Sequence, residues 1–502
     1  CSTHSYGASM TLGLFDLRDC DANGRIGHFT VPRSNVVVET PALLPVINPK
    51  LQTISPSTLA SKFDVQILIT NSYIIHQNTN LHAEAIEKGL HKLLDFPGAI
   101  MTDSGSFQLA EYGNVDVTTS EIIHFQDAIG SDIATPLDIP TPPDAPYDLA
   151  QLDLETTFER LELSKSLVDG DMLISAPIQG STHLDLREQS AIDAYALGLD
   201  VFPIGAAVPL LTQYRFKDVV DIIMATKRGL GLDAIVHLFG AGHPMMFAMA
   251  VAAGCDLFDS AAYALYARRG SYLTTQGTKQ LVDLDHFPCH CPVCSTYTPS
   301  ELQNISQLEC ESLLAEHNLY VSFDELNRIK VAIKEGNLLE LVELRSASHP
   351  AMLEGCRALF QYSDQLERQD PSVKGTFFYV SNLSSVRPEI LRHHNNLTRL
   401  NIGMNVLLTT DILSPSCTSD YSEILCVKPP FGPFPISLSH TYPLTAEIPS
   451  HTDIVSFKQA VVGISTLVSL HPSTTFTFAH NNWPRTILEK LPGDVKFINL
   501  SP

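Results

Sequence analysis

The stretch "AIVHLFGAGHPMMFAMAVAAGCDLFDS" (234–260) holds one complete strand–helix–strand unit and decides the fold class. The apolar run at 234–240 predicts a buried strand, and "HPMMFAMAVAAG" (243–254) predicts a helix that ends at a glycine. A second apolar run at 256–260 predicts another strand. Two strands joined through a helix run parallel, because the helix carries the chain back to the starting end of the sheet. The stretch therefore predicts an α/β protein.

Apolar runs of this kind recur along the first half of the chain. Segments long enough for a helix separate most of them, such as 181–198, and 118–130, which begins with a Thr-Thr-Ser-Glu capping signal. Eight alternating units predict a closed TIM (β/α)8 barrel, and an open doubly wound sheet is the alternative. The expected strands lie at 40–47, 65–70, 99–103, 133–138, 172–179, 201–206, 234–240 and 256–260.

The residues around the expected barrel predict further structure. Before it, "GRIGHFTVPRSNVVVE" (24–39) predicts a β-hairpin that could cover one end of the barrel. After it come a cysteine cluster and helical segments, which predict a zinc-binding subdomain at about 280–345. We therefore expect a catalytic region over residues 10–350 that contains both the barrel and this subdomain.

The two ends of the chain differ from this region in composition. Residues 1–9 precede Met10 and follow no structural pattern, so we interpret them as extraneous to the fold. Beyond residue 350, Pro, Ser and Thr increase, and short strand and helix patterns mix. These patterns predict one or two small α+β domains, at 351–430 and 431–502, and "KPPFGPFP" (428–435) is interpreted as a loop.

Charge and cysteine usage limit the possible functions. The 502 residues include 32 Lys and Arg against 55 Asp and Glu, a net charge of −23. Such acidity argues against general nucleic-acid affinity, although a local basic groove remains possible. We find no apolar run long enough for a membrane span and no signal-peptide pattern. The clustered cysteines favour metal ligation in a reducing compartment over disulfides, so we expect a cytoplasmic protein.

Five residues that could carry chemistry stand at the carboxyl ends of five different expected strands. They are Asp103, Asp138, Gln179, Gly205 and Asp259. In a TIM barrel these strand ends meet on one face, where active sites are built. A single carboxylate at a strand end is more often a satisfied structural group, but three that converge with an amide predict a site.

Two aspartates across a pocket suit a substitution at a sugar carbon, because one can attack or stabilise an oxocarbenium-like centre while the other transfers protons. The third aspartate, with Gln179 and the backbone near Gly205, can read the edge of a purine-like base. Phe107 could stack on that base, although core packing explains it equally well. A retaining glycosidase is an alternative, but the single tryptophan, Trp483, lies far from the expected barrel, and glycosidase clefts are typically lined with tryptophan.

The sequence "CHCPVC" (289–294) predicts a metal site. Its thiolates have the spacing C-x-C-x2-C, which suits tetrahedral zinc. The fourth ligand could be His317, on a predicted helix, or one of the nearer residues His286 and His290. Four protein ligands leave no open coordination position, so we expect one structural Zn²⁺ ion rather than a catalytic one.

A basic pair, Arg268 and Arg269, follows the last expected strand in an otherwise acidic half of the chain. Arginine side chains bind phosphate groups with paired hydrogen bonds, so this pair could bind RNA beside the site. The alternative is a solvated loop or ion pairs with the acidic surface.

Longer motifs in the same half resemble the tRNA-guanine transglycosylases, and among them the archaeal branch. The resemblance covers about residues 10–347, and it is specific because several long motifs agree in order and spacing. The motifs are "VETPALLPVINP" (38–49), "MTDSGSFQ" (101–108), "PLDIPTPP" (136–143), "PIQGSTHLDLR" (177–187), "GAAVPL" (205–210), "LFGAGHP" (238–244), "LFDSAAYALYARRG" (257–270), "CHCPVC" (289–294) and "HNLYVS" (317–322).

The resemblance implies a zinc-bearing TIM barrel that exchanges a guanine in tRNA for a 7-deazaguanine base without ATP. It implies that Asp259 attacks the ribose C1′ and forms a covalent RNA–enzyme intermediate, with Asp103 as general acid and base. Positions that match base-binding residues of the family are Ser104, Phe107, Asp138, Gln179, Gly205, Ala206 and Val208, and Phe239 is a further candidate for a stacking wall. Zinc would bind Cys289, Cys291, Cys294 and His317.

Two motifs select the archaeal branch. This chain has "DSGSFQ" (103–108) where bacterial members usually have DSGGFQ. It has "GAAVPL" (205–210) where they have a Gly-Gly pair followed by Leu-Ala-Val-Gly. Both resemble archaeal enzymes, which insert 7-cyano-7-deazaguanine (preQ0) at position 15 of the tRNA D-loop, a step in archaeosine formation. A loop with bulkier side chains suits a flat nitrile better than an aminomethyl group.

One feature departs from the family pattern. Archaeal members often end in a basic RNA-binding PUA domain, whereas residues 351–502 carry 11 basic and 12 acidic side chains, and no PUA domain is apparent. We therefore expect tRNA affinity to come from these domains, from a homodimer or from a separate PUA-bearing protein. A non-catalytic subunit that keeps the fold and the zinc is a further alternative, but Asp103 and Asp259 both stand in intact motifs.

Overall fold

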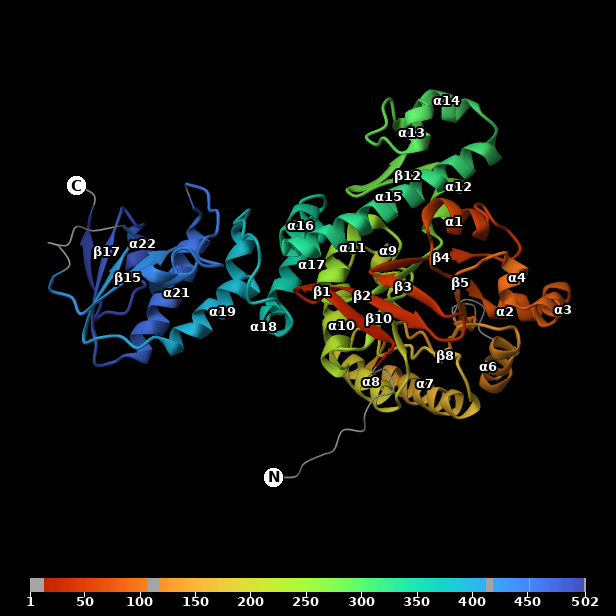
Figure 1. Ribbon diagram of the computed structural model, residues 1–502, viewed down its shortest axis with the longest axis horizontal. Coiled ribbons are helices and arrows are strands. Elements are labelled where there is room, and N and C mark those ends of the chain that lie inside the picture. The colour runs from red at the N-terminus through yellow and green to blue at the C-terminus, as the bar shows by residue number, and fades with distance from the viewer. Residues whose placement is uncertain (1–12, 107–116, 412–418, 451, 501–502) are drawn as a thin grey trace. The chain divides into compact units, whose positions relative to one another are not determined.

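The central sheet of the protein consists of eight parallel strands. The computed structural model describes residues 13–106, 117–411, 419–450 and 452–500 (Figure 1). The strand order is β8-β7-β6-β5-β4-β11-β10-β9, and each strand overlaps one of those expected from the sequence. The strands are β4 (Ala42–Ile47), β5 (Ile67–Asn71), β6 (Ala99–Asp103), β7 (Ile133–Ala134), β8 (Leu173–Ile174), β9 (Val201–Ile204), β10 (Ile235–Leu238) and β11 (Leu257–Ser260).

Strands β8 and β9, at the two ends of this order, also lie beside each other. Parallel bridges join Ser175 to Val201 and Ile178 to Ile204. The Ile178 amide donates to the Pro203 carbonyl at 2.7 Å. The sheet therefore closes on itself, which confirms the TIM barrel and excludes the open doubly wound sheet.

Helices follow the strands and cover the outside of the barrel (Figure 1). None of the helices that the structure describes is long and apolar enough to cross a membrane. They are α1 (Pro56–Phe63), α2 (Ser72–Gln77), α3 (Thr79–Lys88), α4 (Leu90–Leu94), α6 (Thr119–Ala128), α7 (Tyr147–Leu167), α8 (Leu184–Ala196), α9 (Val208–Thr212), α10 (Phe216–Gly229), α11 (Pro244–Ala253) and α12 (Ala262–Arg268).

The expected capping signals set the ends of two of these helices. Helix α6 begins with a capping box, in which the Thr118 hydroxyl accepts from the Glu121 amide and the Glu121 carboxylate accepts from the Thr118 amide at 2.7 Å. Helix α11 ends at Gly254, whose φ of +114° is a left-handed conformation that glycine adopts without steric cost.

Alternate residues of each strand point into the barrel. The apolar inward residues form one buried cluster: Leu44, Ile67, Ile69, Ala99, Met101, Ile133, Leu173, Val201, Ile235 and Leu257. Because the side-chain period of a strand is two, the next inward positions on β5, β6, β10 and β11 are Asn71, Asp103, His237 and Asp259. The barrel interior therefore changes from apolar to polar at the carboxyl ends of these strands, where TIM barrels carry their sites.

An antiparallel three-stranded sheet covers the opposite end of the barrel. It consists of β1 (Phe15–Asp21), β2 (Gly24–Val31) and β3 (Val36–Thr40), so the expected hairpin is confirmed and gains one strand. Its Phe29 and Val38 join the apolar cluster inside the barrel. Its Arg25 forms a buried ion pair with Asp256, with Nε 2.6 Å from Oδ1.

A small subdomain follows the barrel and carries the cysteine cluster. It contains β12 (Ser271–Thr274), β13 (Gly277–Gln280), η1 (Leu281–Asp283), α13 (Pro292–Thr296), α14 (Pro299–Asn304) and the long α15 (Gln307–Glu335). Buried Tyr272, Val293 and Leu319 pack in the same apolar cluster as barrel residues such as Leu59 and Ile122. The subdomain therefore shares a core with the outer helices of the barrel.

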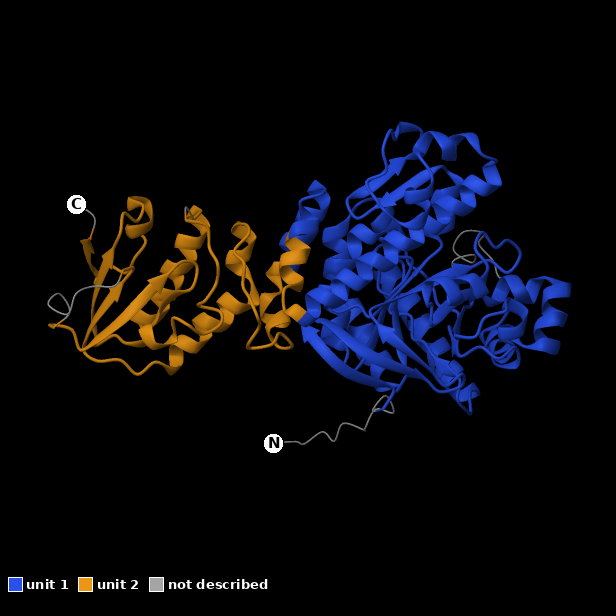
Figure 2. Cartoon of the chain, turned by 45° about the horizontal axis from the view of Figure 1, so that its top comes forward, with its two compact units in different colours: residues 1–334, 344–359 blue, residues 335–343, 360–502 orange. Residues whose placement is uncertain are grey.

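The chain divides into two compact units (Figure 2). Unit 1 comprises residues 1–334 and 344–359, and unit 2 comprises 335–343 and 360–502. The chain changes from one unit to the other at the end of α15 and within α16 (Leu338–Ser346) and α17 (Pro350–Gln361).

Unit 2 contains one mixed sheet, with the strand order β16-β15-β14-β17-β18. The expected boundary at residue 430 falls between β15 and β16, which pair antiparallel from Leu425–Pro435 to Lys428–Gly432. The stretch interpreted as a loop at 428–435 therefore includes a strand, and residues on both sides of 430 share one sheet. The elements are α18 (Ser363–Glu367), η2 (Asn382–Val386), α19 (Pro388–Asn396), η3 (Leu397–Arg399), β14 (Asn405–Thr409), β15 (Glu423–Lys428), β16 (Gly432–Pro435), η4 (Ile436–Leu438), α21 (Ile454–Leu470), β17 (Thr475–His480), α22 (Arg485–Leu488) and β18 (Lys496–Asn499).

Candidate active site and metal centre

Asp103 ends strand β6 and is held by two neighbouring groups. The Asn71 side-chain amide, at the end of β5, donates to its Oδ2 at 3.0 Å, and the Gly105 amide lies 3.4 Å from its Oδ1. Burial, together with the negative charges of Asp138 and Asp259, raises the pKa of Asp103 to about 7. A carboxyl with this pKa can both donate and accept a proton near neutral pH.

Asp259 has different surroundings at the end of β11. Its Oδ1 accepts a hydrogen bond from the Gly240 amide at 2.8 Å, and Nε2 of the buried His237 lies 3.0 Å from the same oxygen. Gly240 has a φ of +70°, and an added Cβ would lie 2.2 Å from the Val208 side chain, so only glycine fits there. The turn after β10 therefore orients the carboxylate of β11.

Asp138 and Gln179 form a buried polar pair between the loops that follow β7 and β8. Gln179 Nε2 donates to Asp138 Oδ2 at 2.6 Å, and burial raises the pKa of Asp138. An added Cβ at Gly205 would lie 2.1 Å from Gln179 Nε2, so this glycine leaves the room that the amide occupies. Gln179 Oε1 is buried and accepts no hydrogen bond within the described residues, which leaves it available to a ligand.

Two serines support this pair from the loop after β6. The Ser106 hydroxyl accepts from the Asp138 amide at 3.0 Å. The Ser104 hydroxyl donates to the Pro136 carbonyl at 3.0 Å and lies 3.1 Å from the Ser106 hydroxyl. Ser104 is buried, and these contacts fix the loop that follows Asp103.

The remaining residues expected to bind the base fall at the ends of β9 and β10. Ala206 has a φ of +56°, a strained value for a residue with a side chain, and Val208 begins α9. Phe239 follows β10 and packs edge-on against His237, with ring centroids 4.7 Å apart. Phe107 lies outside the residues that the structure describes.

The basic pair after β11 is only partly available. Arg268 Nε donates to a Glu311 carboxylate oxygen at 2.8 Å, and its Nη2 donates to the Thr53 hydroxyl at 3.2 Å. Arg269 stands exposed at the end of α12. Arg268 therefore forms an ion pair with the acidic surface, which was the alternative to phosphate binding.

Asn71, Ser106 and His237 are three further polar residues of this region, which the sequence motifs alone do not single out. Asn71 contacts Asp103, Ser106 contacts Asp138, and His237 contacts Asp259. The alternation of side chains along a strand could have indicated two of them. Asn71 lies two residues after Ile69 and His237 two residues after Ile235, so each faces the barrel interior. Ser106 lies in a turn, and nothing in its local sequence indicates the contact with Asp138.

The three cysteines and His317 come together in the subdomain. Their ligand atoms all lie within 4.8 Å of one another, so the cluster could hold a metal ion. His317 Nδ1 lies 3.4 Å from the Cys294 sulfur, and its Nε2 donates to the Leu273 carbonyl at 3.0 Å. That hydrogen bond places the proton on Nε2 and leaves the lone pair of Nδ1 facing the thiols. Tyr272 stacks on the ring, with centroids 3.6 Å apart.

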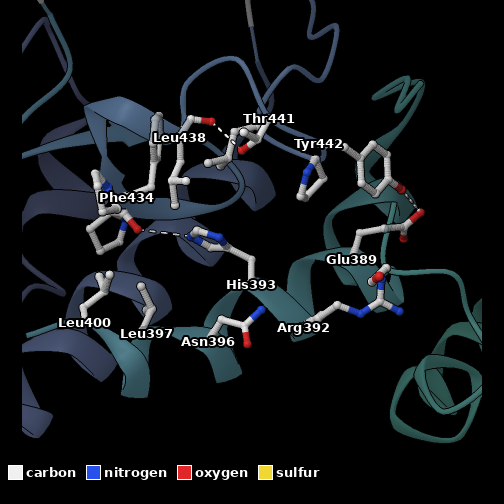
Figure 3. Close-up of a pocket in the computed structure, with 15 residues that line it drawn as sticks. Glu389, Arg392, His393, Asn396, Leu397, Leu400, Phe434, Leu438, Thr441 and Tyr442 are labelled. Carbon is white, nitrogen blue, oxygen red and sulfur yellow. Dashed lines mark hydrogen bonds between the residues drawn. The ribbon is translucent and has the colours of Figure 1, made fainter. Parts of the chain in front are cut away.

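Unit 2 contains a separate pocket of about 190 Å³ (Figure 3). Leucines and prolines line much of it, together with Glu389, Arg392 and His393. Arg392 donates to Glu367 at 2.8 Å and to Asp370 at 2.9 Å, and Glu389 belongs to a buried network of ion pairs. Burial and the neighbouring imidazole lower the pKa of His393 to about 4. Arg392 and Glu389 are therefore already engaged in ion pairs, and the carboxylates at the strand ends of the barrel are the better candidate for chemistry.

The sequence was also compared with known proteins. The sequence model of the family described as queuine tRNA-ribosyltransferase matches residues 19–351. The tRNA-guanine(15) transglycosylase of Haloferax volcanii is 57% identical over 487 residues, which are 97% of this chain and 94% of that protein. Its namesake in Methanosarcina barkeri is 48% identical over 486 residues, 97% of this chain and 98% of that protein. The Methanocaldococcus jannaschii protein of the same name is 48% identical over 459 residues, 88% of this chain but 69% of that protein. The chain belongs to the tRNA-guanine transglycosylase family.

Proposed function

We propose that this protein replaces the guanine at position 15 of the tRNA D-loop with preQ0, through a covalent aspartyl–ribose intermediate, as a step in archaeosine formation. The contrast between its two strand-end aspartates supports this most strongly. Asp103, with a pKa of about 7, is suited to proton transfer. Asp259 is fixed through one oxygen, which leaves the other for attack.

The first half of the reaction removes guanine. Asp259 forms a bond to the ribose C1′ as the bond from C1′ to guanine N9 breaks, and that electron pair goes to the leaving base. Protonated Asp103 supplies the proton that neutralises the base. The second half reverses these steps. The incoming preQ0 gives its N9 proton to Asp103 and attacks C1′, and the ester electron pair returns to Asp259. Each proton and electron pair is thus balanced without another reactant.

Asp138 and Gln179 would recognise the base. Guanine and preQ0 share an edge with N–H donors and a carbonyl acceptor, which suits the Asp138 carboxylate and the Gln179 side chain. The backbone of Gly205 and Ala206 would approach the same edge, and Val208 and Phe239 would line the pocket. We also assign Ser104 and Phe107 to the base site, on the match to the family motif.

We further propose that the cysteine cluster binds one structural zinc ion through Cys289, Cys291, Cys294 and His317. Three thiolates and one imidazole make a complete tetrahedral set, so the ion would stabilise the subdomain and take no part in the reaction. The orientation of His317, fixed by the Leu273 carbonyl, supports this assignment.

Replacing Cys291 with serine should remove the metal and destabilise the protein. We expect a fall of at least about 3 kcal/mol in the free energy of unfolding, because metal-binding energy contributes directly to folding. Elemental analysis and denaturant unfolding measure the two effects. Cys310→Ser is the matched control, since Cys310 is a half-buried free cysteine outside the cluster. Equal zinc content in both variants would contradict the assignment.

The protein would act on tRNA in the cytoplasm. Arg269, which is exposed at the end of α12, could contact RNA phosphates, and Arg268 could do so if its ion pair with Glu311 opened. We propose that a homodimer or a separate PUA-bearing protein supplies further tRNA affinity, because residues 351–502 are nearly neutral.

The test is base exchange. The protein is incubated with tRNA that carries radiolabelled guanine at position 15, with and without preQ0, and the loss of label is followed. We expect loss only with preQ0, and no loss from tRNA labelled at other guanines. A parallel reaction adds an extract containing PUA-bearing protein, and an unchanged rate there would reject the need for such a partner. No exchange in either reaction would favour the non-catalytic subunit instead.

A further inference from the structure

His237 is a buried histidine at the polar end of the barrel interior. It lies two residues beyond Ile235, which belongs to the apolar cluster inside the barrel, so its ring points inward beside the site. The side chain is fully buried, and neither ring nitrogen makes a hydrogen bond of standard geometry within the described residues. A buried polar ring without such a bond is uncommon and calls for a functional explanation.

The ring has one charged neighbour at short range. Nε2 lies 3.0 Å from Oδ1 of Asp259, and the Gly240 amide donates to that same oxygen at 2.8 Å. Both groups come from β10 and the turn after it. Among the described residues, both of these contacts are made to Oδ1 of Asp259 and neither to Oδ2. The two oxygens of this carboxylate are therefore not equivalent.

We propose that His237 is a positioning residue that, with the Gly240 amide, holds Oδ1 of Asp259 and thereby makes Oδ2 the attacking atom. This inference depends on the proposed function. A carboxylate held through one oxygen loses rotational freedom about its χ2 bond, so the free oxygen stays aligned with the reacting carbon. A histidine can do this from the neighbouring strand because its ring reaches across the gap between β10 and β11.

The packing of the ring keeps it in place. Phe239 contacts His237 edge-on, with an angle of 79° between the ring planes. Because Phe239 is also assigned to the wall of the base pocket, His237 lies between the pocket wall and the nucleophile. Loss of the ring nitrogen should therefore slow attack on C1′ without removing the contacts that bind the base.

Three substitutions of His237 test whether Oδ1 of Asp259 needs an N–H donor at the position of Nε2. His237→Gln keeps an N–H donor at about the reach of Nε2, His237→Asn has a donor that is too short, and His237→Phe has a ring of similar size with no donor. His243→Asn is the control, because His243 caps helix α11 by accepting the Met245 amide, and asparagine caps helices well.

The readouts separate chemistry from binding and folding. The rate of covalent RNA–protein adduct formation is measured in single turnover at saturating tRNA, beside the Kd for preQ0 and the midpoint of thermal unfolding. We expect His237→Phe and His237→Asn to slow adduct formation about 10- to 100-fold, the effect of losing one close polar contact with a charged group. We expect His237→Gln to stay within about fivefold of wild type, and the Kd for preQ0 to stay within about twofold in all variants.

The result that overturns the proposal is adduct formation within twofold of the wild-type rate in both His237→Asn and His237→Phe. An equal fall in the rate of adduct formation in His237→Gln and His237→Asn also overturns it. The rate would then not depend on how far the N–H donor reaches toward Asp259. If His237→Phe does not fold, the comparison of glutamine with asparagine decides. Absence of an adduct in the wild-type protein rejects the proposed function and this assignment with it, whereas an intact adduct with insensitive variants rejects this assignment alone.

Discussion

Asp259→Asn should abolish base exchange and leave no covalent adduct with tRNA. An amide is a much poorer nucleophile than a carboxylate, so we expect a loss of at least about 10⁴-fold in kcat. In the wild type the Gly240 amide donates to Oδ1 of Asp259 at 2.8 Å. The side-chain oxygen of asparagine can accept the same hydrogen bond, so the fold should persist. The measurement is a denaturing gel of enzyme with labelled tRNA, together with the rate of guanine release.

The matched control is Asp193→Asn. Asp193 lies on α8, where it accepts a hydrogen bond from Gln189, away from the strand ends. We expect it to retain the adduct and the exchange rate. The same gel with Asp103→Asn tests the division of roles. An adduct with Asp259→Asn but none with Asp103→Asn would show that Asp103 is the nucleophile and would reverse the assignment.

The barrel could be predicted from the sequence because its strands are local features. Each is a short apolar run that needs no knowledge of its partners. The lengths of the strands were harder to predict, and β7 and β8 are examples. Strands expected at 133–138 and 172–179 extend only over Ile133–Ala134 and Leu173–Ile174. Pro136 and Pro177 follow closely, and a residue without an N–H donor interrupts the ladder of hydrogen bonds.

The acidic residues of the site could be predicted for a related reason. A carboxylate after a buried apolar run is costly unless it is used, so Asp103 and Asp259 stand out. His237 does not stand out, because it lies inside its apolar run and resembles a core residue. Only the alternation along β10, with Ile235 inside the barrel, shows that His237 faces the same interior as the aspartates.

The strand pairing of unit 2 could not be predicted from local patterns. Its central strand β14 pairs with β15 on one side and with β17 on the other, Leu407 lying opposite Ile424 and Thr477. Such pairing depends on contacts between distant parts of the chain. Composition changes near residue 430 suggested a boundary, but the sheet crosses it through β15 and β16.

Asp103→Asn should remove activity and at the same time stabilise the protein at neutral and alkaline pH. A general acid contributes about 10²- to 10⁴-fold to the rate, so we expect kcat to fall by about 10³-fold. The stability effect follows from the pKa of Asp103, which is about 7 in the folded protein against an ordinary value of 3.8. Folding therefore favours the protonated carboxyl, and ionising it costs free energy.

The raised pKa of Asp103 destabilises the folded wild-type protein only at pH values where the carboxyl can ionise. Below about pH 4 the carboxyl is protonated in both the folded and the unfolded chain, so it carries no penalty. Between about pH 4 and pH 7 the unfolded chain ionises first, and the penalty on the wild type grows by about 1.4 kcal/mol per pH unit. Above pH 7 both states are ionised and the penalty is constant. Asparagine never ionises, so the variant escapes the penalty throughout.

Denaturant unfolding at pH 5 and pH 8 measures the difference between the two proteins. We expect the advantage of Asp103→Asn over wild type to be about 2 to 3 kcal/mol larger at pH 8 than at pH 5. Comparing the two pH values cancels the changes in packing and hydrogen bonding that the substitution itself introduces, such as the altered contact with Asn71. Asp193→Asn should give the same stability difference at both pH values. An equal difference for Asp103→Asn would mean that its carboxyl ionises normally, and the protein would then lack the proton donor that guanine release requires.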